Sequence, residues 1–89
     1  MADQNKDFQP LSDLTIKKRA FVRKLRGGKD FTSRMSALGF TPGTVVTVIQ
    51  NYGHGPVLVT AKDVRVALGR GEALKVLVEA LPDEQEEHD

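Results

Sequence analysis

The hydrophobic pattern changes its period within residues 10–79, and each period predicts a different element. In residues 19–23 small and branched apolar side chains alternate with longer ones, which is typical of a strand with one buried side. Further along, Phe31, Met35 and Leu38 recur four and three positions apart, as on one face of a helix. We therefore predict a strand that is followed by a short helix.

Glycine and proline mark the predicted ends and turns. Gly39 follows the helical pattern, where a left-handed residue commonly closes a helix. Pro42 and Gly43 occupy the second and third positions of a predicted turn, in which proline presets its own φ and glycine tolerates a positive φ. Lys62 and Asp63 separate two apolar runs, which indicates a two-residue hairpin turn. We expect Gly39, Pro42 and Gly43 to be structural turn residues.

Short runs rich in valine predict a mostly β domain. The expected strands are residues 19–23, 45–49, 57–61, 64–68 and 74–78. Five short strands in about seventy residues favour a small, closed or nearly closed barrel, because closure removes exposed strand edges. Alternation predicts that one set of side chains fills its interior: Ala20, Val22, Val46, Val48, Val66, Leu68, Val76 and Val78.

Charge is distributed unevenly along the chain. Residues 1–9 and 80–89 are polar and lack periodicity, so we expect a mobile N-terminal segment, one folded domain over residues 10–79 and an acidic, disordered tail. The tail holds five acidic residues and no lysine or arginine. Residues 8–79 hold 12 basic against 5 acidic residues. Such a basic body favours an acidic partner, which is a nucleic acid, a lipid surface or a protein.

Composition excludes several function classes. The 89 residues suffice for one small domain, and the absence of cysteine excludes disulfides and thiolate metal sites. No apolar run approaches the roughly 20 residues of a membrane-spanning helix, and the polar N-terminus is unlike a secretory signal, so we expect a cytoplasmic protein. The acids of the body are scattered, and His54 is its only histidine. We expect no enzyme, no catalytic residue, no cofactor and no metal site within one chain.

A basic run around the first predicted strand is the strongest polar signal. Its members are Lys17, Lys18, Arg19, Arg23, Lys24, Arg26, Lys29 and Arg34. Alternation places Phe21 outward between Arg19 and Arg23, which is a composition found on single-stranded nucleic-acid platforms and also on protein contacts. A third interpretation is that the N-terminal segment covers Phe21.

Three stretches resemble one known family. Residues 33–46 (Ser-Arg-Met-Ser-Ala-Leu-Gly-Phe-Thr-Pro-Gly-Thr-Val-Val) resemble the signature of the FeoA domain, found in ferrous iron transport protein A. Residues 66–73 resemble the family's closing hairpin and its Glu-Ala turn, and residues 11–14 resemble its usual opening. The family often has Pro-Gly shortly after this opening, where the present chain has Ile16 and Lys17. The resemblance covers about residues 11–79.

This resemblance implies both a fold and a function. The fold is an SH3-like barrel of five to six short strands with a helix after the first strand. The function is that of a small cytosolic accessory of the bacterial ferrous iron permease FeoB, which carries a cytosolic GTP-binding domain. FeoA domains also occur fused to iron-dependent repressors, but this chain has no DNA-reading helix-turn-helix pattern, so it resembles the stand-alone form.

Recognition by a barrel of this size depends on outward side chains, because packing occupies the inward ones. We expect contact with the cytosolic part of a FeoB-type permease, made by a monomer or weak homo-oligomer. The expected contact residues are Arg19, Phe21, Arg23, Arg34, Phe40, Tyr52 and His54. The alternatives are a small-barrel nucleic-acid-binding protein that uses residues 17–34 and, less favoured, an iron carrier.

Overall fold

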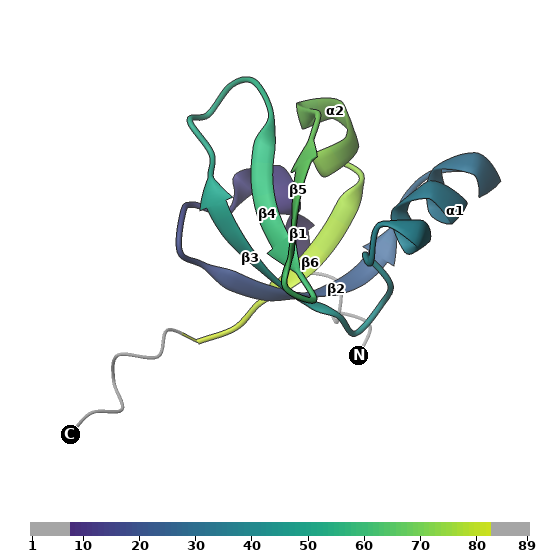
Figure 1. Ribbon diagram of the computed structural model, residues 1–89, viewed down its shortest axis with the longest axis horizontal. Helices are drawn as coiled ribbons and strands as arrows, with labels where there is room; N and C mark the ends of the chain where they lie inside the picture. Colours follow the sequence, from purple (N-terminus) through teal and green to yellow (C-terminus); the bar gives the residue numbers. More distant parts are fainter. Residues whose placement is uncertain (1–7, 83–89) are drawn as a thin grey trace.

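Six strands form one curled antiparallel sheet in the computed structural model, which describes residues 8–82 (Figure 1). The elements in chain order are β1 (Phe8–Pro10), η2 (Leu11–Asp13, a 3-10 turn), β2 (Arg19–Leu25), α1 (Lys29–Ala37), β3 (Val45–Gln50), β4 (Val57–Ala61), β5 (Val64–Leu68), α2 (Arg70–Ala73) and β6 (Val76–Ala80). This confirms the predicted mostly β class.

The order of strands in the sheet makes the first and the last strand neighbours. The order is β1-β6-β2-β3-β4-β5, so the last strand inserts between the first two. Every neighbouring pair is antiparallel. The β4–β5 hairpin closes through Lys62 and Asp63, whose φ angles of 54° and 67° are the positive values that a type I′ turn requires. The predicted two-residue turn is therefore confirmed.

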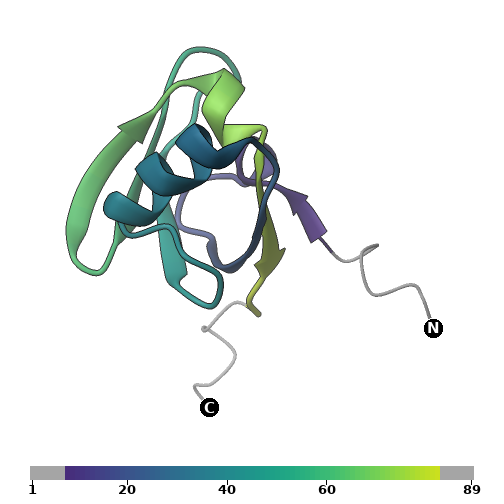
Figure 2. The same cartoon turned by 90° about the vertical axis from the view of Figure 1, so that its right-hand side faces the viewer.

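The interior of the curled sheet forms the hydrophobic core. Of the eight predicted core residues, seven are buried and Val66 is partly buried against the others. Helix α1 lies at one end of the curled sheet and adds Phe31 and Met35 to the core (Figures 1 and 2). The helical pattern identified from the sequence thus marks the buried face of α1, although Leu38 beyond its end is exposed.

Two glycines make the turns that follow α1. Gly39 has φ +99°, and Gly43 has φ +94°. The backbone N–H of Thr44 donates to the carbonyl of Thr41 over 3.0 Å, which closes the predicted turn around Pro42 and Gly43. The N–H of Gly43 also donates to the carbonyl of Val22 over 2.7 Å, so this turn is fixed against β2.

The predicted boundaries of the domain were too narrow at both ends. Phe8 lies opposite Glu79, and Pro10 lies opposite Leu77, so residues 8 and 9 belong to a strand and not to a mobile segment. At the other end Ala80 still belongs to β6. Both errors have the same cause, because the partner strand that orders each end is distant in sequence. Residues 1–7 and 83–89, for which mobility was also expected, lie outside the described range.

Candidate functional site

The outward sides of β1, β6, β2 and β3 form a continuous surface, which we call the outer sheet face. Its first row follows from the strand register and runs from Phe8 through Glu79 and Phe21 to Val45. Neighbouring side chains in such a row are close enough to contact one another. Two aromatic side chains therefore flank one carboxylate on this surface.

A β-bulge changes the direction of β2 beside this row. The register between β2 and β6 shifts between Val22 and Lys24, and both Arg23 and Lys24 are exposed. A bulge places an extra residue on one strand, which here gives two consecutive cations on the same side of the barrel. Arg26 follows at the end of the strand and is also exposed.

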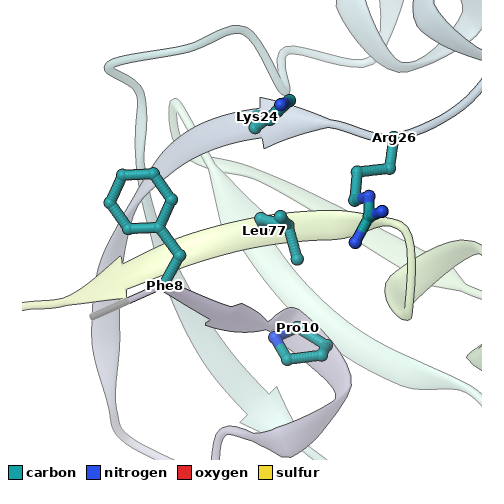
Figure 3. Close-up of a pocket in the computed structure, with 5 residues that line it drawn as sticks. All are labelled: Phe8, Pro10, Lys24, Arg26 and Leu77. Carbon is teal, nitrogen blue, oxygen red and sulfur yellow. The ribbon is translucent and has the colours of Figure 1, made fainter. Parts of the chain in front are cut away.

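A hollow of 380 Å³ lies on the outer sheet face beyond the bulge. Its lining residues come from β1, from β6 and from the end of β2: Phe8, Pro10, Leu77, Lys24 and Arg26. Figure 3 shows Leu77 at the centre, with Phe8 and Pro10 of β1 on one side and the two cations on the other. The hollow therefore combines an apolar floor with a basic rim.

The cations of this surface differ in what surrounds them. The Nε of Arg23 donates to Oε1 of Glu79 over 2.7 Å, and its guanidinium lies 4.8 Å from the centre of the Phe21 ring. Lys24 and Arg26 have no ion-pair partner among residues 8–82. An anionic group that approaches the hollow therefore meets two cations whose charge is not neutralised by a described neighbour.

The structure brings three of the seven predicted contact residues onto the outer sheet face. Arg19, Phe21 and Arg23 occupy one side of β2, and Phe21 is neither buried nor fully exposed. The nearest described part of the N-terminal segment is β1, which pairs with β6 and not with β2. The guanidinium of Arg23 lies over the Phe21 ring, and β6 separates β1 from β2.

Arg34 projects from α1 and contacts α2. Its guanidinium donates to the carboxylate of Glu72 and lies 5.9 Å from the ring centre of Phe31. The other carboxylate oxygen of Glu72 accepts a hydrogen bond of 3.3 Å from the N–H of Gly69 at the start of α2. Arg34 therefore connects two helices, and it does not line the hollow.

The prediction that Phe40 points outward was wrong. Its side chain is completely buried, with an exposed fraction of 0%. Gly39 reverses the chain direction after α1, and the N–H of Phe40 donates to the carbonyl of Met35 over 2.9 Å. This reversal directs the ring of Phe40 into the barrel, so its side chain is excluded from any contact surface.

Tyr52 and His54 are exposed on the loop between β3 and β4. Asn51 fixes the start of the loop, because its Nδ2 donates to the carbonyls of Ser12 and Leu14 over 2.9 and 2.7 Å. Arg70 donates to Oδ1 of Asn51 over 2.6 Å. The predicted strands 45–49 and 57–61 imply a loop between them, but the sequence contains no signal for this polar network.

None of the five residues that line the hollow was among the predicted contact residues, although the sequence pattern pointed to three of them. Lys24 and Arg26 belong to the basic run, and Leu77 lies between two predicted inward valines, which implies that it points outward. Phe8 and Pro10 were missed because β1 was not predicted. The hollow exists only because β6 inserts between β1 and β2.

Among residues 8–82 no three His, Cys, Asp or Glu side chains are grouped so that they could hold a metal ion. Neither helix in this part of the chain has the length and apolar character needed to span a membrane.

Comparison with known proteins supplies the family. The FeoA domain family matches residues 9–80. This chain belongs to the FeoA domain family. The FeoA chain is 33% identical over 70 residues to a Methanocaldococcus jannaschii protein with the assigned name Fe(2+) transport protein A, which covers 79% of this chain and 84% of that protein.

Solved FeoA structures share the fold. A crystal structure described as the iron uptake regulatory protein FeoA superimposes with a TM-score of 0.80 at 30% identity, covering 83% of this chain and 99% of that one. Stenotrophomonas maltophilia FeoA in complex with zinc, described as a prokaryotic SH3 domain protein, superimposes with a TM-score of 0.71 at 29% identity, covering 80% and 89%. The predicted SH3-like barrel is therefore confirmed for this FeoA chain.

Proposed function

We propose that this FeoA protein is a cytoplasmic accessory of ferrous iron transport that binds the cytosolic part of a FeoB-type permease. Membership of the FeoA family and the names of its relatives support a role in ferrous iron transport. The single observation that carries the docking proposal is the hollow on the outer sheet face, because it joins an apolar floor to two cations without a described ion-pair partner.

The side chains of the hollow specify which side chains the permease must carry at the contact. Leu77 and Phe8 can bury an apolar side chain, while Lys24 and Arg26 can pair with carboxylates beside it. Aromatic and arginine residues are enriched among the side chains that dominate binding energy at protein interfaces. The proposed partner segment therefore carries an apolar side chain next to one or two acidic residues.

The direct test is a calorimetric titration of the permease's cytosolic GTP-binding domain with the protein. We expect K24E/R26E to weaken binding at least about tenfold, because repulsion replaces attraction at the rim. The matched control is K29E/R65E, which makes the same change of charge at two exposed positions that do not line the hollow. Equal loss of affinity in both double variants would show that net charge, and not the hollow, governs binding.

A second pair of variants tests the apolar floor. Leu77→Ala truncates the central side chain of the hollow. The control is Val64→Ala, which truncates an apolar side chain of β5 that is 56% exposed and lies outside the hollow. We expect only Leu77→Ala to weaken binding to the permease domain. If both variants bind like the unaltered protein while K24E/R26E does not, the contact is electrostatic alone and the apolar part of the proposal fails.

The alternative of nucleic-acid binding receives less support from the geometry. A stacking platform needs an aromatic face that a base can cover, and the ring of Phe21 is half-buried with the Arg23 guanidinium 4.8 Å from its centre. A gel shift with single-stranded oligonucleotides is the check, run beside the titration. A saturable shift that K24E/R26E abolishes, together with no binding of the permease domain, would favour the alternative.

A further inference from the structure

The turn between η2 and β2 carries residues that its backbone conformation does not favour. The N–H of Lys18 donates to the carbonyl of Thr15 over 3.3 Å, so Ile16 and Lys17 occupy the two central positions of this turn. Lys17 has φ +71°, whereas Ile16 is not among the residues with positive φ. That combination belongs to a type II turn, in which proline is common at the first central position and glycine is favoured at the second.

The fold does not require either of these side chains. A left-handed conformation costs a lysine free energy that glycine avoids. The N–H of Lys17 donates to the carbonyl of Val48 over 2.7 Å, which is a backbone contact that glycine would retain. Ile16 is 48% exposed and lies outside the hydrophobic core. Strained residues are concentrated at functional sites, so this turn is a candidate contact surface.

A large exposed aromatic side chain lies at the same end of the barrel. Tyr52 is 70% exposed on the loop between β3 and β4. Its neighbour Asn51 donates to the carbonyl of Leu14 over 2.7 Å, two residues before Ile16, so the loop and the turn are joined. Figure 1 shows both connections on the side of the barrel away from α1. We call Ile16, Lys17 and Tyr52 the turn–loop tip.

Positive charge adjoins the turn–loop tip. Lys17 is exposed and has no ion-pair partner among residues 8–82. Lys18 and Arg19 follow it in sequence, and Asp13 is the acid of the same connection. Tyrosine is enriched at membrane–water interfaces, and lysine near an anionic bilayer is attracted to its headgroups. The chemistry of the tip therefore matches the surface of an anionic membrane.

We propose that the turn–loop tip contacts the surface of an anionic lipid bilayer. The side chains of Ile16 and Tyr52 enter the interfacial layer, and the ammonium group of Lys17 lies at the headgroup phosphates. Apolar burial and electrostatic attraction together determine the strength of such interfacial binding, so both kinds of side chain are needed.

The proposed lipid contact and the hollow use different ends of β2. Lys17 precedes this strand, and Lys24 of the hollow follows seven residues later, which is up to about 23 Å at the rise of a strand. The protein can therefore meet a membrane and the permease with separate surfaces. The lipid contact does not depend on the proposed docking to the permease.

The β4–β5 hairpin provides a matched control site. Lys62 there also has a positive φ, of 54°, and Val64 is 56% exposed. In this hairpin the type I′ turn requires the positive φ, and Asp63 places a carboxylate next to the lysine. β4 begins after the Tyr52 loop and ends at this hairpin, so the control site lies at the other end of that strand.

Co-sedimentation of the full-length protein with lipid vesicles tests the contact without any permease. The vesicles contain phosphatidylglycerol and phosphatidylethanolamine in equal parts, and phosphatidylcholine vesicles are the uncharged reference. We expect saturable binding to the anionic vesicles at low salt and much weaker binding to the reference. I16S/K17G should lower the affinity at least about tenfold, because it removes apolar area and one charge. K62G/V64S loses the same charge and should bind like the unaltered protein.

Thermal unfolding of a single variant separates binding from folding. Glycine relieves the left-handed strain at position 17, so Lys17→Gly should retain or raise the melting temperature. The same variant should bind anionic vesicles about fivefold more weakly, since it lacks one cation. A lower melting temperature would show that the fold itself needs Lys17 and would overturn the argument from the turn.

Tyr52 reports the contact directly. The chain has one tyrosine and no tryptophan, so a nitroxide-bearing lipid quenches tyrosine emission only when the ring of Tyr52 lies close to the bilayer. We expect strong quenching that I16S/K17G reduces and K62G/V64S does not. Absence of binding to anionic vesicles, equal loss in both double variants, or binding without quenching would each overturn the proposal. Binding of the permease domain, whether present or absent, changes none of these outcomes.

Discussion

At the scale of single residues, the backbone conformation of the turn after α1 restricts which residue can occupy position 43. Gly43 has φ +94°, and an added Cβ would meet no atom within 4 Å. Any penalty for a side chain at this position therefore comes from the backbone conformation and not from a clash.

We expect Gly43→Ala to lower the free energy of unfolding by about 1 kcal/mol or more. The control is Gly71→Ala, because Gly71 lies within α2, has open space around it and needs no positive φ. That substitution should be neutral or stabilising, since alanine has the higher helix propensity. Thermal unfolding of both variants is the measurement. Equal melting temperatures for Gly43→Ala and the unaltered protein would contradict the strain argument.

Phe40 shows how burial changes the meaning of an aromatic residue. Its ring is among the largest completely buried side chains, so truncation leaves a cavity. We expect Phe40→Ala to cost about 3–5 kcal/mol, which is a large part of the stability of a domain this small. Chemical denaturation should show it, with Phe40→Leu as a milder variant. A small loss of stability combined with weakened partner binding would restore Phe40 as a contact residue.

At the scale of elements, the loop between β3 and β4 is positioned by a side chain from α2. Arg70 donates to the carbonyl of Gly55 over 3.0 Å, to the carbonyl of Ser12 over 3.4 Å and to Oδ1 of Asn51 over 2.6 Å. A planar guanidinium can serve several acceptors at fixed angles, which an ammonium on a flexible stem cannot do. The position of the exposed Tyr52 loop therefore depends on an element 15 or more residues away.

We expect Arg70→Ala to lower stability by about 1–3 kcal/mol, because acceptors that are partly buried lose their donor. Arg70→Lys should recover only part of this loss. The chain has one tyrosine and no tryptophan, so tyrosine fluorescence reports Tyr52 alone. Its quenching by acrylamide should change in both variants. Unaltered stability and unaltered quenching would show that the network does not hold the loop.

At the scale of the whole molecule, the division of charge governs association. Residues 8–79 carry 12 basic and 5 acidic side chains, and the five acids of residues 83–89 nearly balance them over the full chain, which has a net charge of +1. The affinity of this basic body for an acidic partner should therefore respond to salt.

We expect binding of the permease's cytosolic domain to weaken as salt rises from about 0.05 to 0.5 M, since exposed charges farther apart than the screening length are largely screened. The slope should be smaller for K24E/R26E than for K29E/R65E, because only the first variant removes the cations of the hollow. Surface plasmon resonance at several salt concentrations gives both slopes. Identical slopes would locate the electrostatic contact outside the hollow.

Local signals determined much of the fold from the sequence alone. Alternation of valines predicted which side chains of β3 and β6 are inward, because strand geometry has a strict period of two. The positive φ values of Gly39 and Gly43 were predictable, since few other residues adopt that conformation readily. The motif over residues 33–46 identified the family because it combines these same helix, turn and strand signals.

Only the tertiary structure decided the features that depend on distant partners. β1 is three residues long and gains its order from β6, which lies almost seventy residues later, so no local pattern marks it. The direction of the Phe40 ring depends on how the chain reverses at Gly39 against the barrel. The hollow requires β1, β6 and the bulged β2 side by side, because its apolar floor and its basic rim come from different strands. Sequence specified which side chains could bind, and long-range strand pairing determined which of them lie together.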